Sequence, residues 1–146
     1  MGIPTTGRIV AVDWGERRIG LAVCDETQTL ASPLDTLTRR PGKRFPMPAF
    51  LTHIAALTPV GLVIGLPLES SGHEGSAATL ARELGAQLGA RTNLPIEYLD
   101  ERMSTARALK AIAEQDGSTR GRKEDVDALA ASILLGQFLE SRRPAP

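Results

Sequence analysis

The 146-residue sequence has little of what disulfide frameworks, zinc sites and aromatic cores require. Cys24 is the only cysteine, which excludes an internal disulfide and every C-x-x-C metal motif. The two histidines, His53 and His73, are far apart and show no H-x-x-x-H spacing, which disfavours a zinc site. Aromatic residues make up only 3% of the chain, so we expect a core of aliphatic side chains.

Long apolar runs and an excess of one charge are also missing. No run approaches the ~20 apolar residues that span a bilayer, and no signal peptide precedes the first apolar segment. We therefore expect a cytoplasmic protein with no membrane partner. The 17 basic and 17 acidic residues give a formal net charge of zero, so there is no global basic field of the kind that marks many nucleic-acid-binding proteins.

The hydrophobic pattern predicts one domain over residues 1–146, with flexible ends at 1–7 and 143–146. Three strands come first, and strands then alternate with helices. This order predicts an α/β fold with a five-stranded mixed sheet, antiparallel over its first three strands, then parallel, and flanked by helices. Strands are expected at 8–12, 19–24, 30–38, 61–66 and 96–99, and helices at 48–57, 76–89, 104–115 and 124–142.

Acidic residues stand at the ends of two predicted strands. Asp13 ends the first strand, whose apolar residues predict burial on both faces. Asp100 and Glu101 end the last strand. Because sites in open α/β sheets form outside the carboxyl ends of strands, we expect these acids to share one edge of the sheet. A buried unpaired charge is costly, so Asp13 either opens a turn or is kept for chemistry.

Two further acids, Asp125 and Asp127, open the last predicted helix. At about 100° per residue, Asp127 falls on the apolar stripe that contains Ala131 and Leu134, whereas Asp125 falls on a side of small and polar residues. Both would also stabilise a helix N-terminus, and this structural explanation stays open. The periodicity nevertheless predicts Asp127 as the carboxylate that faces the sheet.

Several carboxylates at one edge repel each other, and protonation or cations must offset that repulsion. Oxygen ligands without His or Cys suit Mg²⁺ or Mn²⁺. Such sites often hold two ions about 4 Å apart, which orient a phosphodiester and lower the pKa of a bound water. Acids in turns and at helix starts are common, so these positions alone leave a purely structural role open.

Four segments resemble the motif blocks of the YqgF/RuvX family, in the same order and over nearly the whole chain. They are AVDWGERRIGLAVCD (11–25), VIGLPLESSGHEG (63–75), LDERMSTARA (99–108) and VDALAASILL (126–135). That family is related to the RuvC Holliday-junction resolvases and has the RNase H-like fold. The resemblance implies a phosphodiester-hydrolysing nuclease in which Asp13, Glu101 and Asp127 are catalytic and bind one or two Mg²⁺ or Mn²⁺ ions. The choice of Asp127 agrees with the helix periodicity.

The resemblance also implies a substrate, and alternatives stay open. The family is assigned to maturation of the 5′ end of pre-16S rRNA, which favours RNA. Its kinship to RuvC implies branched DNA as the alternative, cut by a homodimer whose symmetry matches the junction. An actin-like nucleotide-binding module is disfavoured, because such proteins close a cleft between two domains. A non-catalytic nucleic-acid-binding domain is a further alternative.

Basic and flexible residues near the acids predict contacts with a phosphate backbone, with ordinary solvated loops as the alternative. Glu16 and Glu69 depart from the family pattern and place negative charge near the expected path of a polyanion. Trp14 is expected to pack beside the first two strands, with stacking on a base as the alternative. The predicted substrate-binding residues are Arg17, Arg18, Arg102, Arg122, Lys123, Gly72 and His73.

Overall fold

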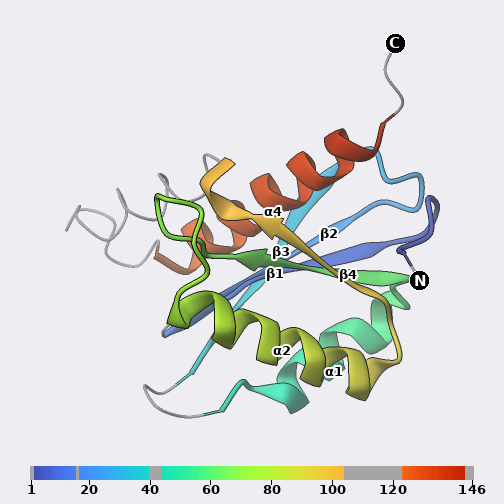
Figure 1. Ribbon diagram of the computed structural model, residues 1–146. Coiled ribbons are helices and arrows are strands. Elements are labelled where there is room, and N and C mark those ends of the chain that lie inside the picture. The colour runs from blue at the N-terminus through green and yellow to red at the C-terminus, as the bar shows by residue number, and fades with distance from the viewer. Residues whose placement is uncertain (1, 16, 40–43, 104–122, 144–146) are drawn as a thin grey trace.

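The computed structural model describes residues 2–15, 17–39, 44–103 and 123–143. Within these ranges, no helix is both long enough and apolar enough to cross a membrane. The elements form one sheet with helices on both faces (Figure 1). The strands are β1 (Ile9–Asp13), β2 (Arg18–Cys24), β3 (Ala31–Thr38), β4 (Gly61–Leu66) and β5 (Ile96–Asp100), and the helices are α1 (Met47–Leu57), α2 (Ser76–Thr92), the 3-10 turn η1 (Glu101–Met103) and α4 (Lys123–Arg142).

The sheet has the spatial order β3-β2-β1-β4-β5. β1 pairs antiparallel with β2, and β2 pairs antiparallel with β3. β4 runs parallel to both β1 and β5. The predicted five-stranded mixed sheet is therefore confirmed. The predicted helix 104–115 lies outside the described residues.

One helix is longer than the sequence predicts. The glycine at position 89 predicts that the second helix ends there, but α2 continues to Thr92. The helix ends where Asn93 adopts the left-handed conformation, with φ 58°, and its backbone N–H donates to the Gly89 carbonyl at 2.9 Å. A left-handed residue of this kind is what ends many helices, and asparagine adopts that conformation more readily than most residues. Gly89 therefore lies within α2 instead of at its end, and it faces Ile96.

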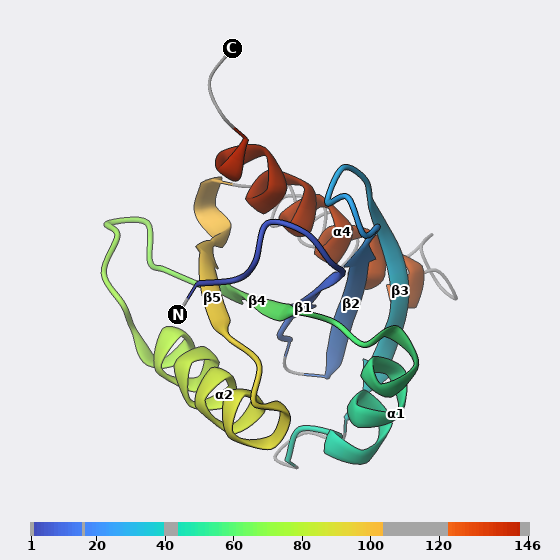
Figure 2. The same ribbon diagram turned by 90° about the vertical axis from the view of Figure 1, so that its right-hand side faces the viewer.

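The two faces of the sheet are covered by different helices. Figure 2 shows α4 on one face and α1 and α2 on the other. Along β1, Ile9 and Ala11 belong to the cluster under α4, whereas Val10 and Val12 belong to the cluster under α1 and α2. This alternation is expected for a strand with period two. The same alternation determines the face of the sheet on which Asp13, the last residue of β1, lies.

The two ends of the described chain lie close together. Ile3 is buried, and the Arg142 guanidinium donates to its carbonyl at 2.6 Å and to the Pro4 carbonyl at 3.1 Å. These contacts attach the N-terminal segment to the end of α4. The flexibility of residues 1–7 and 143–146 stays a prediction.

The turn between β2 and β3 provides a pH-dependent contact. The Asp25 carboxylate accepts hydrogen bonds from the backbone N–H of Leu30 at 2.9 Å, from the Thr27 hydroxyl, and from the backbone N–H of Thr29 at 2.8 Å. Because these donors favour the ionised form, they lower the pKa of Asp25 to about 2.

A lowered pKa means that Asp25 stabilises the fold above its unfolded pKa of about 3.9. That stabilisation is lost as the pH falls through about 2. We expect the stability difference between wild type and Asp25→Asn to be largest above pH 4 and to shrink below it. Urea unfolding at several pH values measures it, and a difference that does not change with pH would contradict the assignment.

Candidate active site

Asp13 is the last residue of β1 and lies on the face covered by α4. Its position follows from the alternation along β1, where Ile9 and Ala11 occupy the same face. The residue is only 2% exposed. A carboxylate is thus kept at the carboxyl end of a central strand, where the sequence predicts it.

The neighbour of Asp13 on β2 brings the start of α4 close. Asp13 pairs with Gly20. A Cβ atom added to Gly20 would collide with the backbone carbonyl oxygen of Asp127 and lie 3.2 Å from the nitrogen of Ala128. The absence of a side chain at Gly20 therefore lets the first turns of α4 rest directly on the sheet beside Asp13.

Substitution of Gly20 should separate these elements. We expect Gly20→Ala to lower the free energy of unfolding by about 1–3 kcal/mol, because the added methyl group meets backbone atoms that cannot rotate away. Gly136→Ala, in the same helix, is the matched control, since nothing lies within 4 Å of its added Cβ. We expect this control to gain about 0.5–1 kcal/mol from helix propensity. Equal effects in chemical denaturation would rule out the close contact.

Glu101 approaches from the other side of Asp13. The register pairs Val12 with Ile64, which places Gly65 beside Asp13. The side chain of Glu101 lies over Gly65, since a Cβ added there would collide with its Oε1 and lie 3.0 Å from its Cδ. Glu101 and Asp127 therefore lie over the two glycines that flank Asp13.

Asp127 is 6% exposed, as the predicted inward-facing position requires. Its Oδ2 accepts from Nε of Arg18 at 2.6 Å. Arg18 begins β2 two residues before Gly20, so it lies on the same face of the sheet. The basic side chain that we predict to contact phosphate is thus placed against one of the three acids. Its role toward a substrate stays a prediction.

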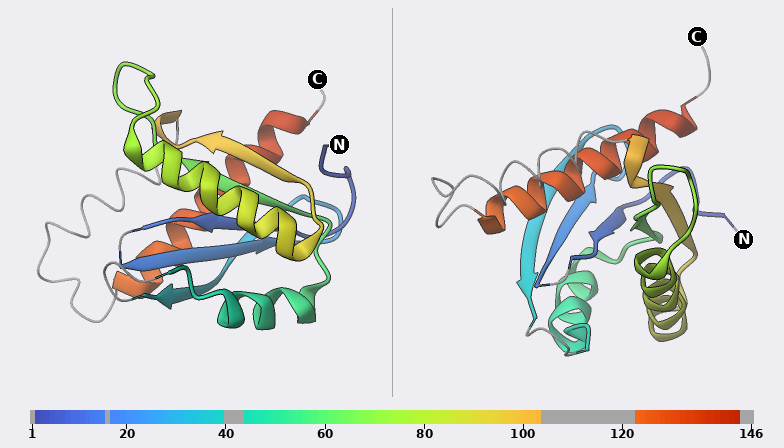
Figure 3. Two further views of the ribbon diagram at one scale, coloured as in Figure 1. Left: turned by 60° about the horizontal axis from the view of Figure 1, so that its bottom comes forward. Right: turned by 60° about the vertical axis from the view of Figure 1, so that its left-hand side comes forward.

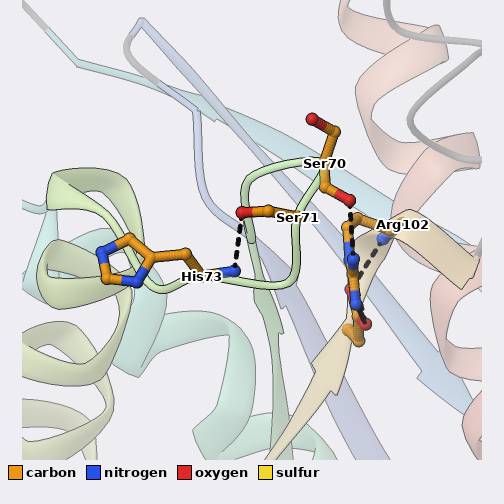
Figure 4. Close-up of polar contacts among 5 residues, drawn as sticks. Ser70, Ser71, His73 and Arg102 are labelled. Carbon is orange, nitrogen blue, oxygen red and sulfur yellow. Dashed lines mark hydrogen bonds and ion pairs between the residues drawn. The ribbon is translucent and has the colours of Figure 1, made fainter.

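Arg102 is held by its own acidic neighbour. Its guanidinium donates to both carboxylate oxygens of Asp100, at 2.9 Å to Oδ2 from one terminal nitrogen and at 3.2 Å from Nε to each oxygen. The Asp100 carboxylate raises the pKa of Arg102. The other terminal nitrogen donates to the Ser70 carbonyl at 3.2 Å, so Arg102 joins the end of β5 to the loop after β4 (Figure 4).

The same loop contains two other predicted substrate-binding residues. Gly72 has φ 89°, and its N–H donates to the Glu69 carbonyl at 2.8 Å. The backbone N–H of His73 lies 3.4 Å from the Ser71 hydroxyl. The His73 ring points away from Arg102 in Figure 4. Gly72 therefore lies beside Arg102, whereas the imidazole does not.

The other predicted substrate-binding residues are Arg17, Arg122 and Lys123. Arg17 is exposed, and its carbonyl accepts from the backbone N–H of Arg39 at 2.8 Å. Lys123 lies in the first turn of α4. Arg122 and Glu16 lie outside the described residues.

Comparison with known proteins identifies the family. Residues 7–141 match the model of the family described as "RuvX: Holliday junction resolvase". The chain belongs to the RuvX family. This RuvX chain is 39% identical over 137 residues to a protein of Roseiflexus sp., covering 94% of this chain and 96% of that one. It is 40% identical over 136 residues to a protein of Koribacter versatilis, covering 93% and 88%. Both relatives have the name "Putative pre-16S rRNA nuclease".

A solved structure shares the fold of this RuvX chain. The structure is that of Thermus thermophilus RuvC bound to a Holliday junction substrate. It aligns with a TM-score of 0.56 and 14% identity, covering 93% of this chain and 95% of that one. The predicted RNase H-like fold is thus confirmed as RuvC-like, whereas identity at this level carries no argument about substrate.

The chemistry of the three acids fits a hard divalent cation. All three offer carboxylate oxygens, the ligands that Mg²⁺ and Mn²⁺ prefer. Within the described ranges, however, no group of three or more His, Cys, Asp or Glu side chains is close enough to hold a metal. Arg18 supplies the positive charge beside Asp127 in this RuvX chain. The predicted metal site of Asp13, Glu101 and Asp127 stays a prediction.

Proposed function

We propose that this chain is a divalent-metal-dependent nuclease that hydrolyses phosphodiester bonds. The observation that supports the proposal best is the arrangement around Asp13. One glycine beside this buried carboxylate lies beneath Glu101, and the other lies beneath the start of α4 at Asp127. Three segments far apart in the sequence thus bring acidic residues to one face at one edge of the sheet.

In this proposal Asp13, Glu101 and Asp127 hold one or two Mg²⁺ or Mn²⁺ ions. The bound ions would lower the pKa of a water molecule and stabilise the leaving oxygen. The three acidic residues would determine where the positive charges of the ions lie. Because Asp13 and Asp127 are 2% and 6% exposed, their charges are screened less by water than those of surface acids.

The basic residues would position the substrate. Asp100 and the Ser70 carbonyl hold the Arg102 guanidinium in one orientation, which makes it a rigid partner for a phosphate approaching the edge. We include Arg17, Arg18, Arg122, Lys123, Gly72 and His73 among the residues that contact the backbone. Such contacts position a strand without reading its sequence.

We propose the 5′ end of pre-16S rRNA as the substrate. The relatives that cover nearly the whole chain have names that specify this RNA. A cytoplasmic location is part of the proposal. The buried free thiol of Cys24 fits a reducing compartment.

Resolution of branched DNA is the second candidate. It is favoured by the description of the family as a Holliday junction resolvase. A resolvase must cut a two-fold junction at two points, which requires a homodimer. Symmetric paired nicks therefore distinguish this activity from the processing of a single RNA strand.

A cleavage assay on matched substrates tests the proposal. The substrates are an RNA spanning the 5′ leader of 16S rRNA, a DNA of the same sequence and a four-way DNA junction, each with Mg²⁺, Mn²⁺ or EDTA. We expect metal-dependent cleavage of the RNA, and none by the Asp13→Asn protein. Paired nicks in the junction with intact RNA would select the second candidate. No cleavage of any substrate would contradict the nuclease assignment.

A further inference from the structure

A groove lies on the opposite face of the sheet from the three acids. It is lined by residues of α2 and of the segment that leads into α1, and has a volume of about 670 Å³. The left panel of Figure 3 shows α1 and α2 on the side that faces the viewer. Ligand pockets in proteins have volumes of about 300–1,000 Å³, so this groove has the size of a binding site. Among the residues that line it are Trp14, Arg39, Arg44, Phe45, Glu83 and Arg91.

The charged residues of the groove are mostly basic. Three arginines line it against one acid, Glu83. Within the described part of the chain, neither Arg44 nor Arg91 makes an ion pair with a carboxylate. By contrast, Arg82, on the same helix as Arg91, pairs with Glu74 at 2.7 Å. The groove thus offers two guanidinium groups to an anionic ligand on a chain whose net charge is zero.

One part of the groove is built from stacked flat groups. The Trp14 and Phe45 rings are 5.9 Å apart with an interplanar angle of 25°. The Arg39 guanidinium lies 4.4 Å from the centre of the Trp14 ring. Aromatic rings and guanidinium planes are the surfaces on which unpaired bases stack. Flat surfaces and basic side chains therefore meet in one groove.

The stacked groups are joined to the edge that holds the acids. Trp14 directly follows Asp13, and it packs against the cluster under α1 and α2. The Arg39 backbone N–H donates to the Arg17 carbonyl at 2.8 Å, and its Nε lies 3.4 Å from the Gly15 carbonyl. Asp13 at the acidic edge and Trp14 in the groove are thus consecutive residues of the chain, although the two sites lie on opposite faces of the sheet.

We propose that this groove binds a single-stranded segment of the nucleic acid whose cleavage occurs at the acidic edge. Bases stack against the Arg39–Trp14–Phe45 group, and Arg44 and Arg91 bind phosphates. The choice of RNA as this strand rests on the proposed function. Binding in the groove depends on the residues that line it and can be tested without any cleavage.

Trp14 provides the signal for the test, because it is the only tryptophan in the chain. The Asp13→Asn protein in EDTA is titrated with a single-stranded RNA of about ten nucleotides, a length within the site sizes of single-strand-binding domains. We expect quenching of Trp14 fluorescence on binding. Inorganic polyphosphate, which has charge but no bases, should bind more weakly and leave the emission nearly unchanged.

Two double variants, made in the same background, separate the groove from general charge. Arg44→Ala with Arg91→Ala should weaken RNA binding by about tenfold or more, and should reduce the slope of log K against log salt by about 1.4, which corresponds to two lost contacts. Arg82→Ala with Arg143→Ala removes the same charge outside the groove, where both arginines pair with exposed glutamates. It should weaken binding by less than twofold.

The results also separate this proposal from the proposed function. Three results would overturn the proposal that the groove binds a single strand. They are the absence of quenching, equal weakening of RNA binding by the two double variants, and polyphosphate binding as tight as RNA binding. Cleavage by the wild-type protein would leave the nuclease assignment standing in each of those cases. Conversely, if quenching depends on Arg44 and Arg91 but the wild-type protein with Mg²⁺ or Mn²⁺ cleaves none of the substrates, the groove is supported and the nuclease assignment is contradicted.

Discussion

Replacing Asp13 with Asn should abolish metal-dependent cleavage and leave the fold intact. The amide has the shape of the carboxylate but lacks its charge. Asp13 lies between the two glycines over which Glu101 and Asp127 are placed, so it is the central ligand of the proposed site. We expect a loss of at least about 10³-fold in rate, which corresponds to about 4 kcal/mol of transition-state stabilisation.

Thermal unfolding gives a second measurement on the same variant. An ion that binds only the folded state stabilises that state by RT ln(1 + [ion]/Kd) and so raises the melting temperature. Mn²⁺ should therefore stabilise the wild-type protein and have little effect on Asp13→Asn. Glu140→Gln is the matched control, because it makes the same chemical change at a carboxylate that is 77% exposed on α4. Its cleavage and its response to Mn²⁺ should equal those of the wild type.

Two outcomes would contradict the role of Asp13. Unchanged cleavage by Asp13→Asn would remove this residue from the mechanism. Equal stabilisation of both proteins by Mn²⁺ would place the ion elsewhere. A variant that neither folds nor cleaves is recognised by its circular dichroism, and Asp13→Ser then provides a second, smaller neutral side chain at the same position.

The fold could be predicted from local patterns because its central strands have a strong signal. β1 and β4 are buried along their whole length, and their apolar runs identify both as buried strands. The end of α2 was predicted wrongly, since glycine at position 89 suggests a stop whereas the left-handed Asn93 provides one. A helix end depends on the conformation of a single residue, which the hydrophobic period does not determine.

The sequence predicts which acidic residues gather at one edge of the sheet, but not the contacts that they make, and their catalytic role stays a prediction. Helix periodicity alone is enough to place Asp127 on the buried face. The roles of Gly20 and Gly65 depend on strand register, which decides which residues lie beside Asp13. The pairing of Arg18 with Asp127 joins residues 109 positions apart. In the sequence, Arg18 belongs to a basic cluster after β1 that fits phosphate binding as well as it fits pairing with an acid. No sequence signal therefore identifies Asp127 as the partner of Arg18.

Loss of Arg18 should have the second largest effect, because it leaves Asp127 without the cation beside it. The side chains of Arg18 and Asp127 are 25% and 8% exposed, so water replaces the lost contact poorly. We expect Arg18→Ala to be destabilised when no divalent ion is present. Combined with Asp127→Asn in a double-mutant cycle, it should give a coupling energy of about 1–3 kcal/mol. The pair Arg82 and Glu74, with both side chains over 40% exposed, should give a much smaller value in the same cycle.

Metal binding then distinguishes the two roles that Arg18 can have. If Arg18 supplies the charge that a metal ion would otherwise supply at Asp127, its removal should tighten Mn²⁺ binding, measured by calorimetry, and Mn²⁺ should restore much of the lost stability. If Arg18 only contacts phosphate, its removal should raise KM for the nucleic acid and leave the affinity for Mn²⁺ unchanged. Arg18→Lys keeps the charge but loses the Nε donor, so an intermediate affinity for Mn²⁺ is expected. Because Arg18 faces an acid across a 2.6 Å contact, we expect the first result.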